Sequence, residues 1–232
     1  MRGLYAIVDL DALESRGLDA LAFASALLDS APCALQLRAK HATPEATLEL
    51  LRALRPLCNA ARVPLVANDR ADLAAVARAD VVHLGQTDAS PALARVLAPD
   101  VRLGLSTHTP EELVSALRAM PDYVAFGPVW STRSKSAPDP IVGVAGVKQA
   151  AQLIRHHARE TGFRPALVAI GGVTLERVAE ITPYADAAAV IADLIPPSDL
   201  LGTDAYDYVR ARARQYAAAF DDPLASFGDV GT

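Results

Sequence analysis

Residues 63–91, with the sequence VPLVANDRADLAAVARADVVHLGQTDASP, carry the pattern on which the fold of this chain depends. Two short apolar runs, 63–67 and 81–84, are typical of buried strands, and a longer stretch separates them. Polar residues follow each run directly. Ser90 and Pro91 then supply an N-capping hydroxyl and a proline at the first helical position. The stretch therefore predicts a strand, a helix, a second strand and the start of a second helix.

The same alternation extends through most of the chain. Leucines recur at helical spacing between the apolar runs, as in residues 48–57. Threonine–proline pairs at 43–44 and 109–110 mark further helix starts, and Glu112 completes a capping box with Thr109. Strand-like apolar runs occupy residues 4–8, 33–37, 63–67, 81–84, 101–105, 123–126, 166–170 and 188–191.

Eight strand–helix units in a chain of 232 residues predict an α/β fold, a single parallel (β/α)8 or TIM barrel. A doubly wound open sheet is the alternative. It is disfavoured because no Gly-x-Gly-x-x-Gly motif follows the first apolar run. No linker divides the chain, so residues 1–220 are predicted to form one catalytic domain. Residues 221–232 are polar and contain glycine, and we expect a loose C-terminal tail there.

The composition is that of a globular protein, with 52% hydrophobic and 21% charged residues. A formal net charge of -5 makes nucleic acid an unexpected partner. The sequence has no apolar run of the ~18 residues that a membrane span requires, and its start lacks a signal-like pattern. Cys33 and Cys58 match no zinc-binding spacing, so we expect free thiols and a cytoplasmic protein.

The second apolar run ends in a cluster of polar side chains. A strand alternates its faces, so Gln36, Arg38 and Lys40 project to one side and Leu37 to the other. Burying an unpaired cation is very costly, so this polar face must reach water or meet an anion. A phosphate-bearing ligand satisfies that condition, and so does a solvated strand end with two surface cations.

Carboxylates appear at the ends of the next two runs. Asn68, Asp69 and Arg70 follow the third run, and Asp88 follows the fourth. The working residues of a β/α barrel gather at the carboxyl ends of its strands, so these side chains are expected near one another. Asp69 and Asp88 are therefore candidates to hold Mg²⁺, together with phosphate oxygens and water. The alternatives are a salt bridge to Arg70 or a turn for Asp69, and a helix-capping role for Asp88.

The later runs end in hydroxyls, cations and glycines. Ser106 stands at the end of the fifth run, and a loop of hydroxyl, basic and aromatic residues, 127–135, follows the sixth. Such a loop fits a lid that closes on an anion, or an ordinary polar surface loop. Gly171 and Gly172 follow the seventh run, where backbone N–H groups can approach a phosphate at a helix N-terminus. His83, within the fourth run, fits a satisfied core histidine.

Short motifs in a specific order and spacing run through the chain: YAI (5–7), QLRxK (36–40), NDR (68–70), HLGQxD (83–88), GxSTH (104–108), GPV (127–129), TxSK (132–135) and IGGV (170–173). Together they resemble the thiamine-phosphate synthase family, of the thiamine monophosphate synthase and TenI-like superfamily. The resemblance runs from Leu4 to about Leu194. It implies a Mg²⁺-dependent transferase that joins 4-amino-2-methyl-5-hydroxymethylpyrimidine diphosphate to a thiazole phosphate, giving thiamine phosphate and diphosphate. The implied mechanism is dissociative: diphosphate leaves, and the thiazole nitrogen captures the methylene cation.

The resemblance also implies roles for individual positions. The pyrimidine diphosphate would be held by Gln36, Arg38, Lys40, Asn68, Ser106 and Lys135. Among these, the residues implied to act in catalysis are Arg38, Lys40, Ser106 and Lys135. Mg²⁺ would be bound by Asp69 and Asp88. The thiazole phosphate would be held by Thr132, Ser134, Gly172 and the backbone of Ile191 and Ala192.

Three positions depart from the pattern of this family. Ala192 stands where the family commonly has serine. Since a neutral hydrogen bond contributes roughly 0.5–1.5 kcal/mol, this change predicts weaker binding of the thiazole phosphate rather than inactivity. Ser134 keeps a hydroxyl where threonine is frequent, and Ala39 replaces a frequent glutamate on the face away from Gln36.

Two other functions remain open at this point: a thiazole tautomerase-like protein and a non-catalytic, phosphate-binding barrel of the thiamine pathway. A tautomerase would not need the polar face of residues 36–40 together with Asp69 and Asp88, whereas Ala192 is the one hint of a binding protein. The sequence leaves open whether the chain forms a homo-oligomer, whether the thiazole substrate is carboxylated, and what Arg133 does.

Overall fold

The computed structural model describes residues 1–132 and 139–221. Within this part of the chain, eight parallel strands close into one barrel whose strand order follows the sequence. The strands are β1 (Gly3–Asp9), β2 (Ala34–Arg38), β3 (Leu65–Asn68), β4 (Val81–Leu84), β5 (Arg102–Thr107), β6 (Tyr123–Phe126), β7 (Ala166–Ile170) and β8 (Ala187–Val190). The predicted barrel is confirmed, and an open sheet is excluded because β8 pairs with β1. The predicted runs 81–84, 123–126 and 166–170 coincide with strands, and the others differ by one or two residues at their ends.

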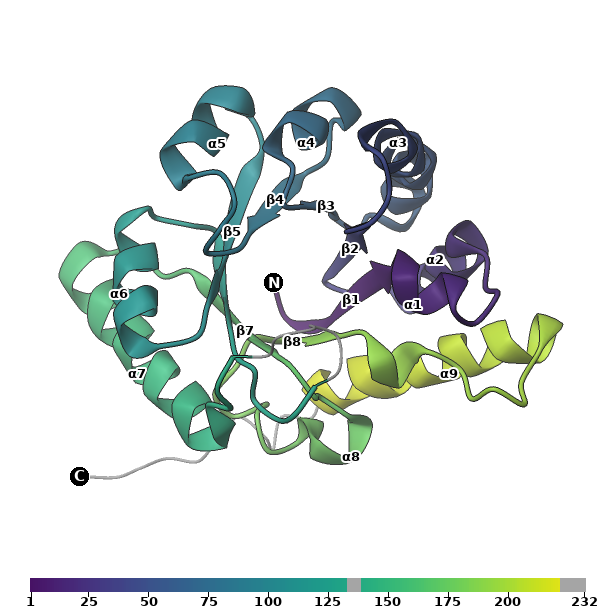
Figure 1. The fold of residues 1–232 in the computed structure, drawn as a ribbon. Helices are drawn as coiled ribbons and strands as arrows, with labels where there is room; N and C mark the ends of the chain where they lie inside the picture. The colour runs from purple at the N-terminus through teal and green to yellow at the C-terminus, as the bar shows by residue number, and fades with distance from the viewer. Residues whose placement is uncertain (133–138, 222–232) are drawn as a thin grey trace.

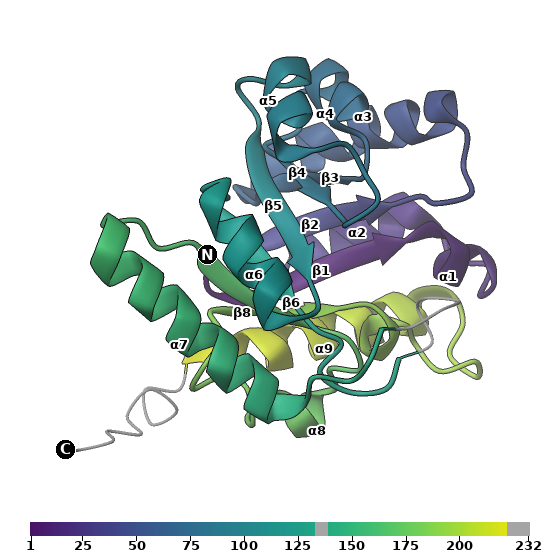
Figure 2. The same cartoon turned by 60° about the vertical axis from the view of Figure 1, so that its left-hand side comes forward.

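Helices surround the barrel (Figure 1). They are α1 (Leu10–Glu14), α2 (Ala20–Leu28), α3 (Pro44–Ala61), α4 (Ala71–Ala77), α5 (Pro91–Leu97), α6 (Pro110–Arg118), α7 (Gly143–Thr161), α8 (Leu175–Val178), the 3₁₀ helix η1 (Ala192–Leu194) and α9 (Gly202–Asp221). Figure 2 shows α6 and α7 running side by side along the outside of the barrel. The predicted tail lies outside the described residues, apart from Asp221 at the end of α9. None of the helices in the described ranges combines the length and the apolar character that a membrane crossing needs.

The helix starts predicted from hydroxyl–proline pairs are present. The side-chain oxygens of Thr43, Ser90 and Thr109 each accept a hydrogen bond, at 3.2 Å, from the backbone N–H three residues later. The predicted capping box is only half formed, because Glu112 accepts the N–H of His108, at 2.7 Å, rather than that of Thr109. Glu112 thereby ties the end of β5 to the first turn of α6.

Side chains along the strands alternate between the barrel interior and the layer under the helices. On β1, Leu4, Ala6 and Val8 pack under the helices, whereas Tyr5 and Ile7 pack inside the barrel. The buried apolar residues inside the barrel are Tyr5, Ile7, Ala34, Val66, Val81, Tyr123, Ala125, Val168, Ala187 and Ala189. Inward positions further along β2 to β5 are polar, so the carboxyl end of the barrel presents polar groups above an apolar floor.

Candidate active site

A pocket of about 710 Å³ opens at the carboxyl ends of the strands. Every predicted site residue that the structure describes lines this pocket: Gln36, Arg38, Lys40, Asn68, Asp69, Asp88, Ser106, Thr132, Gly172, Ile191 and Ala192. Ser134 and Lys135 lie outside the described residues, as does Arg133. The barrel thus brings together residues that are spread over most of the sequence. They meet at the carboxyl end of the barrel, where β/α-barrel enzymes have their active sites.

Gln36 and Arg38 point from β2 into the barrel, and other side chains hold both of them. Nε2 of Gln36 donates a hydrogen bond to Oδ1 of Asn68 at 3.0 Å. Nη1 of Arg38 lies 2.6 Å from Oδ2 of Asp9, a buried carboxylate at the end of β1. The Arg38 side chain is only 15% exposed, so it is not the solvated surface cation of the alternative interpretation. Asp9 instead fixes the guanidinium at the wall of the pocket.

Lys40 lies just beyond the end of β2 and reaches toward the end of β3. Its Nζ is 3.2 Å from Oδ2 of Asp69. The Lys40 side chain is 45% exposed, so it keeps contact with water as well as with the pocket. This position suits a cation that meets a phosphate entering from solvent.

Asp69 adopts a left-handed backbone conformation, with φ at 65°, directly after β3. Its N–H donates to the carbonyl oxygen of His83 at 2.8 Å. Burial raises the pKa of the Asp69 carboxyl, and the neighbouring Asp88 carboxyl raises this pKa further, whereas Lys40 lowers it. The two carboxyls therefore lie side by side in the pocket, where Asp88 opposes the ionisation of Asp69.

Of the structural alternatives for these carboxylates, the salt bridge to Arg70 and the helix-capping role are wrong, whereas Asp69 does lie in a bend directly after β3. Arg70 pairs with Asp72, at 2.6 Å between Nη2 and Oδ2, because the two side chains are neighbours at the exposed start of α4. Ser90 rather than Asp88 caps α5, since its Oγ accepts from the first turn of that helix. Asp88 instead accepts a backbone N–H within its own turn at 2.6 Å.

The paired carboxylates fit a divalent cation. Without a cation nearby, the negative charge of Asp88 raises the pKa of Asp69. A divalent cation between the two carboxylates would stabilise both negative charges. In the described ranges, no group of three or more acidic, histidine or cysteine side chains could hold a metal ion. A cation at Asp69 and Asp88 would therefore take its other ligands from water and from substrate oxygens, which is how proteins commonly bind Mg²⁺.

Two histidines support the site from below and from the side. Oγ of Ser106 lies 2.8 Å from Nε2 of His83, and Nδ1 of His83 lies 2.8 Å from the hydroxyl of Tyr123. His83 is buried, so it fits the core role considered from the sequence. Nδ1 of His108 lies 2.6 Å from the carbonyl oxygen of Gly127 and connects the ends of β5 and β6.

The glycine turn after β7 is shaped by close backbone packing. Gly172 has a φ of 64°, in the left-handed region that favours glycine. A Cβ at this position would lie 2.5 Å from the carbonyl oxygen of Ser131 and 2.8 Å from Cβ of Trp130. Only glycine therefore allows the start of the loop after β6 to pack against this turn.

The helix that follows the glycine turn, α8, begins directly after Thr174. The N–H of Leu175 donates to Oδ2 of Asp193 at 3.0 Å. Arg212 and Tyr216, both on α9, hold the same carboxylate. The first N–H of α8 is therefore already satisfied within the protein.

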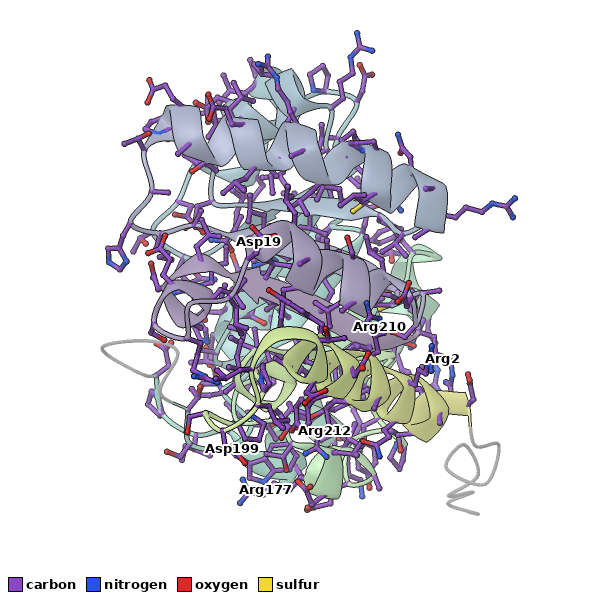
Figure 3. All side chains as sticks on the ribbon, turned by 90° about the vertical axis from the view of Figure 1, so that its right-hand side faces the viewer. Arg2, Asp19, Arg177, Asp199, Arg210 and Arg212 are labelled. Atoms are coloured by element: carbon purple, nitrogen blue, oxygen red, sulfur yellow. The ribbon has the colours of Figure 1, made fainter. Side chains whose placement is uncertain are left out.

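Among the charged residues that sequence reasoning missed are Arg177 and Asp9, the partner of Arg38. Arg177 lines the pocket, and its guanidinium carbon lies 5.7 Å from the ring centroid of Trp130. Figure 3 labels Arg177 beyond α9 on the same side of the molecule as Arg212. A cation in the last turn of a helix is common, so no sequence signal marks Arg177. Asp9 directly ends the first strand, and the rule that site residues follow strands would have found it.

Comparison with known sequences identifies consistent relatives. A family model described as thiamine monophosphate synthase matches residues 4–194. The thiamine-phosphate synthase of Koribacter versatilis is 42% identical over 200 residues, which are 83% of this chain and 88% of that protein. The thiamine-phosphate synthase of an Azoarcus species is 39% identical over 225 residues, which are 95% of this chain and 98% of that protein.

Solved structures share the architecture with different chemistries. The thiamine phosphate pyrophosphorylase of Pyrococcus furiosus has a TM-score of 0.76 at 24% identity, covering 94% of this chain and 95% of that one. A 2-keto-3-deoxy-6-phospho-gluconate aldolase of Zymomonas mobilis has a TM-score of 0.63 at 16% identity, covering 94% and 93%. Similarity at these identities shows the fold alone, so the pocket residues and the sequence relatives must decide the chemistry.

Proposed function

This chain belongs to the thiamine monophosphate synthase family, which makes it a transferase of thiamine biosynthesis, and we propose that its pocket joins a pyrimidine diphosphate to a thiazole phosphate. The products are thiamine phosphate and diphosphate. The observation that carries this proposal is one pocket that gathers cations, two facing carboxylates and a glycine turn. These groups match two phosphorylated substrates and a divalent cation.

The leaving diphosphate occupies the side of the pocket formed by β2 and β3 in this proposal. Arg38 is held there by Asp9, and Lys40 reaches the same side from the end of β2. Asn68 adds an uncharged amide. Preorganised cations stabilise the charge that develops on a departing diphosphate, and they do so without reorganising during the reaction.

Asp69 and Asp88 would hold Mg²⁺ beside this diphosphate. When bound, Mg²⁺ would neutralise part of the charge on the diphosphate oxygens. Asp69 faces Lys40 as well as Asp88, so the two carboxylates and the cation share one corner of the pocket. This corner can therefore order the diphosphate from two sides.

The thiazole phosphate would lie across the pocket from the diphosphate. Gly172, Thr132 and the backbone of Ile191 and Ala192 line that side. Holding the phosphate there brings the thiazole nitrogen toward the methylene carbon that the diphosphate leaves, which is catalysis by orientation. Lys135 and Ser134 lie outside the described residues, and their roles toward the diphosphate and the thiazole phosphate stay proposals from the sequence.

The proposal is tested by measuring diphosphate release from the purified protein with both substrates and Mg²⁺. We expect release of diphosphate and formation of thiamine phosphate only when both substrates are present. A thiazole tautomerase would instead isomerise the thiazole without the pyrimidine. A binding protein would bind either substrate in calorimetry without turnover, and each of these two results would overturn the proposal.

Two finer points also stay proposals. Exposed apolar side chains on the adjacent helices α4 and α5 favour a homo-oligomer: Val76 is 55% exposed, Leu93 is 49% exposed and Val96 is 77% exposed. Light scattering during gel filtration measures the oligomeric state directly.

A cytoplasmic location is supported by the free thiols of Cys33 and Cys58.

A further inference from the structure

A chain of hydrogen bonds, buried in the middle and partly buried at both ends, crosses the barrel under the pocket and joins Asn68 to Ser106. At one end, Oγ of Ser106 lies 2.8 Å from Nε2 of His83. Nδ1 of His83 lies 2.8 Å from the hydroxyl of Tyr123, and the hydroxyls of Tyr123 and Tyr5 are 2.7 Å apart. The first half of the chain is therefore continuous from β5 to β1.

The second half runs from β1 to β3. Tyr5 donates to Oε1 of Gln36 at 2.6 Å, and Nε2 of Gln36 donates to Oδ1 of Asn68 at 3.0 Å. Each of the strands β1 to β6 contributes one member to the whole chain, always from an inward position. A network built from six consecutive strands is a property of the closed barrel and is absent from any single motif.

The middle of this network is shaped to hold Tyr123. Its ring stacks on that of His83, with 5.6 Å between centroids and 8° between planes. A Cβ on Gly104 would lie 2.1 Å from Cζ of Tyr123 and 2.4 Å from its hydroxyl oxygen. The glycine on β5 therefore leaves the space that the Tyr123 ring fills, and both tyrosines are almost fully buried.

Proton counting gives the chain one direction. Each tyrosine hydroxyl has a single proton, and Tyr5 uses its proton for Gln36. Tyr123 must then donate to Tyr5, and His83 must donate to Tyr123 from Nδ1. In the neutral imidazole the other nitrogen, Nε2, is an acceptor, so it takes the proton of Ser106. The reverse direction would require the side-chain amides of Gln36 and Asn68 both to be flipped, so that each exchanges its oxygen and nitrogen positions.

We propose that Tyr5 and Tyr123 are positioning residues that hold this chain of hydrogen bonds in the direction that the proton count gives. Oδ1 of Asn68 is occupied by Gln36, so the Asn68 amide N–H groups are left to donate to the diphosphate. The hydroxyl of Ser106 donates its proton to His83. Oγ of Ser106 can therefore accept a hydrogen bond from a donor on the substrate, such as the exocyclic amine of the pyrimidine. The two ends of the chain thus present opposite hydrogen-bonding characters to one ligand. This inference rests on the proposed function.

The first test compares the kcat and the KM values for both substrates of Tyr123→Phe with those of the unmodified protein. Phenylalanine keeps the ring against Gly104 and removes the hydroxyl, so His83 and Tyr5 both lose a buried partner. We expect kcat to fall about 10- to 100-fold. This range corresponds to the free-energy cost of leaving the buried polar groups of His83 and Tyr5 without a partner. The KM for thiazole phosphate should stay unchanged, because the chain ends only at predicted pyrimidine ligands.

A mutant cycle separates positioning from general loss of stability. If Tyr123 acts through Ser106, the kcat loss from Tyr123→Phe should shrink several-fold in a Ser106→Ala background. Tyr5→Phe should couple in the same way to Asn68→Ala. Fully additive losses in both cycles would show that the tyrosines serve the fold alone, and would overturn the proposal.

A measurement independent of turnover checks the direction of the chain. In the unmodified protein with ¹⁵N-labelled histidine, the ¹⁵N shifts of neutral His83 should identify the tautomer protonated at Nδ1. An Nε2-protonated tautomer would reverse the chain and contradict the inference even if the enzyme is active. Conversely, the Nδ1 tautomer in a protein that releases no diphosphate would reject the proposed function and leave the network intact.

Tyr206→Phe is the matched control. The Tyr206 hydroxyl accepts a hydrogen bond from the backbone of Asp19 at 3.1 Å on the outside of the barrel. Removing it deletes a tyrosine hydroxyl and one hydrogen bond at a site that does not line the pocket. Its kinetic constants and its His83 shifts should match those of the unmodified protein.

Discussion

Lys40 and Asp69 form an ion pair at the rim of the pocket, with 3.2 Å between Nζ and Oδ2. The cation predicted for the diphosphate and the carboxylate predicted for Mg²⁺ thus share one contact. A metal ion at Asp69 would compete for this contact and release Lys40 toward the diphosphate. Mg²⁺ and the pyrimidine diphosphate should therefore favour each other's binding, as linked ligands do.

Asp69→Asn and Asp88→Asn should each lower turnover strongly and weaken its dependence on Mg²⁺. Losing one of two carboxylate ligands removes a charge-assisted contact, so we expect the half-saturating Mg²⁺ concentration to rise roughly tenfold or more. Titrating diphosphate release with Mg²⁺ measures this. The exposed carboxylate of Asp72 pairs with Arg70 outside the pocket, so Asp72→Asn is the matched control. Unchanged Mg²⁺ titrations in both site variants would remove these residues from the metal site.

Asp69→Asn should also raise the melting temperature of the protein in EDTA at pH 7. Burial and Asp88 raise the pKa of Asp69 above its ordinary value. Between the ordinary and the raised pKa, the folded protein binds more protons than the unfolded chain, so stability falls as the pH rises through that window. Asparagine removes this loss, and the gain over the unmodified protein should vanish below the window. A lower melting temperature at pH 7 would mean that the pairing with Lys40 outweighs burial.

Asp9→Asn should raise the KM for the pyrimidine diphosphate about tenfold, since a charge-assisted contact to Arg38 is lost. Asparagine still accepts the N–H of Ala12, which Asp9 caps at 3.1 Å, so α1 should keep its start. Asp19 caps α2 in the same way, through the N–H of Ala22 at 2.8 Å, whereas the ion pair with Arg38 belongs to Asp9. Steady-state kinetics of Asp9→Asn beside Asp19→Asn measures the effect. Equal KM values in the two variants would show that Arg38 needs no partner.

Ala192→Ser should lower the KM for thiazole phosphate about two- to tenfold, because a hydroxyl adds one hydrogen bond to the phosphate. Ala192 lines the pocket at the start of η1, next to the predicted phosphate position. The KM for the pyrimidine diphosphate should not change. Ala179→Ser, at an exposed position after α8, is the control. A higher thiazole-phosphate KM in Ala192→Ser would mean that the methyl group packs against the ligand.

Arg177→Gln should raise the KM for thiazole phosphate about two- to fivefold at low salt, the size expected for an exposed ionic contact. Arg177 lines the pocket beside Trp130, so its charge lies near the predicted phosphate. The difference should shrink as salt screens the charge. Arg118→Gln, on the outer surface of α6, serves as the control. Identical KM values at low salt would place Arg177 outside the binding site.

The sequence by itself determined the barrel and predicted many of the residues that line its pocket. Runs 81–84, 123–126 and 166–170 form strands at the predicted positions, because strand and helix periodicities are local properties of the chain. Hydroxyl–proline pairs likewise cap α3, α5 and α6 where they stand. Since the carboxyl ends of parallel strands meet at one end of a barrel, polar residues after each strand could be assigned to one pocket.

Only the tertiary structure decided which charges and hydroxyls meet. Arg70 is the sequence neighbour of Asp69 but pairs with Asp72, whereas Lys40 reaches Asp69 from another strand. The hydroxyls of Tyr5 and Tyr123 meet inside the barrel although most of the chain's first half separates them. Ion pairs and buried hydrogen bonds depend on distances of a few ångströms, and these distances are set by the closure of the barrel rather than by spacing along the sequence.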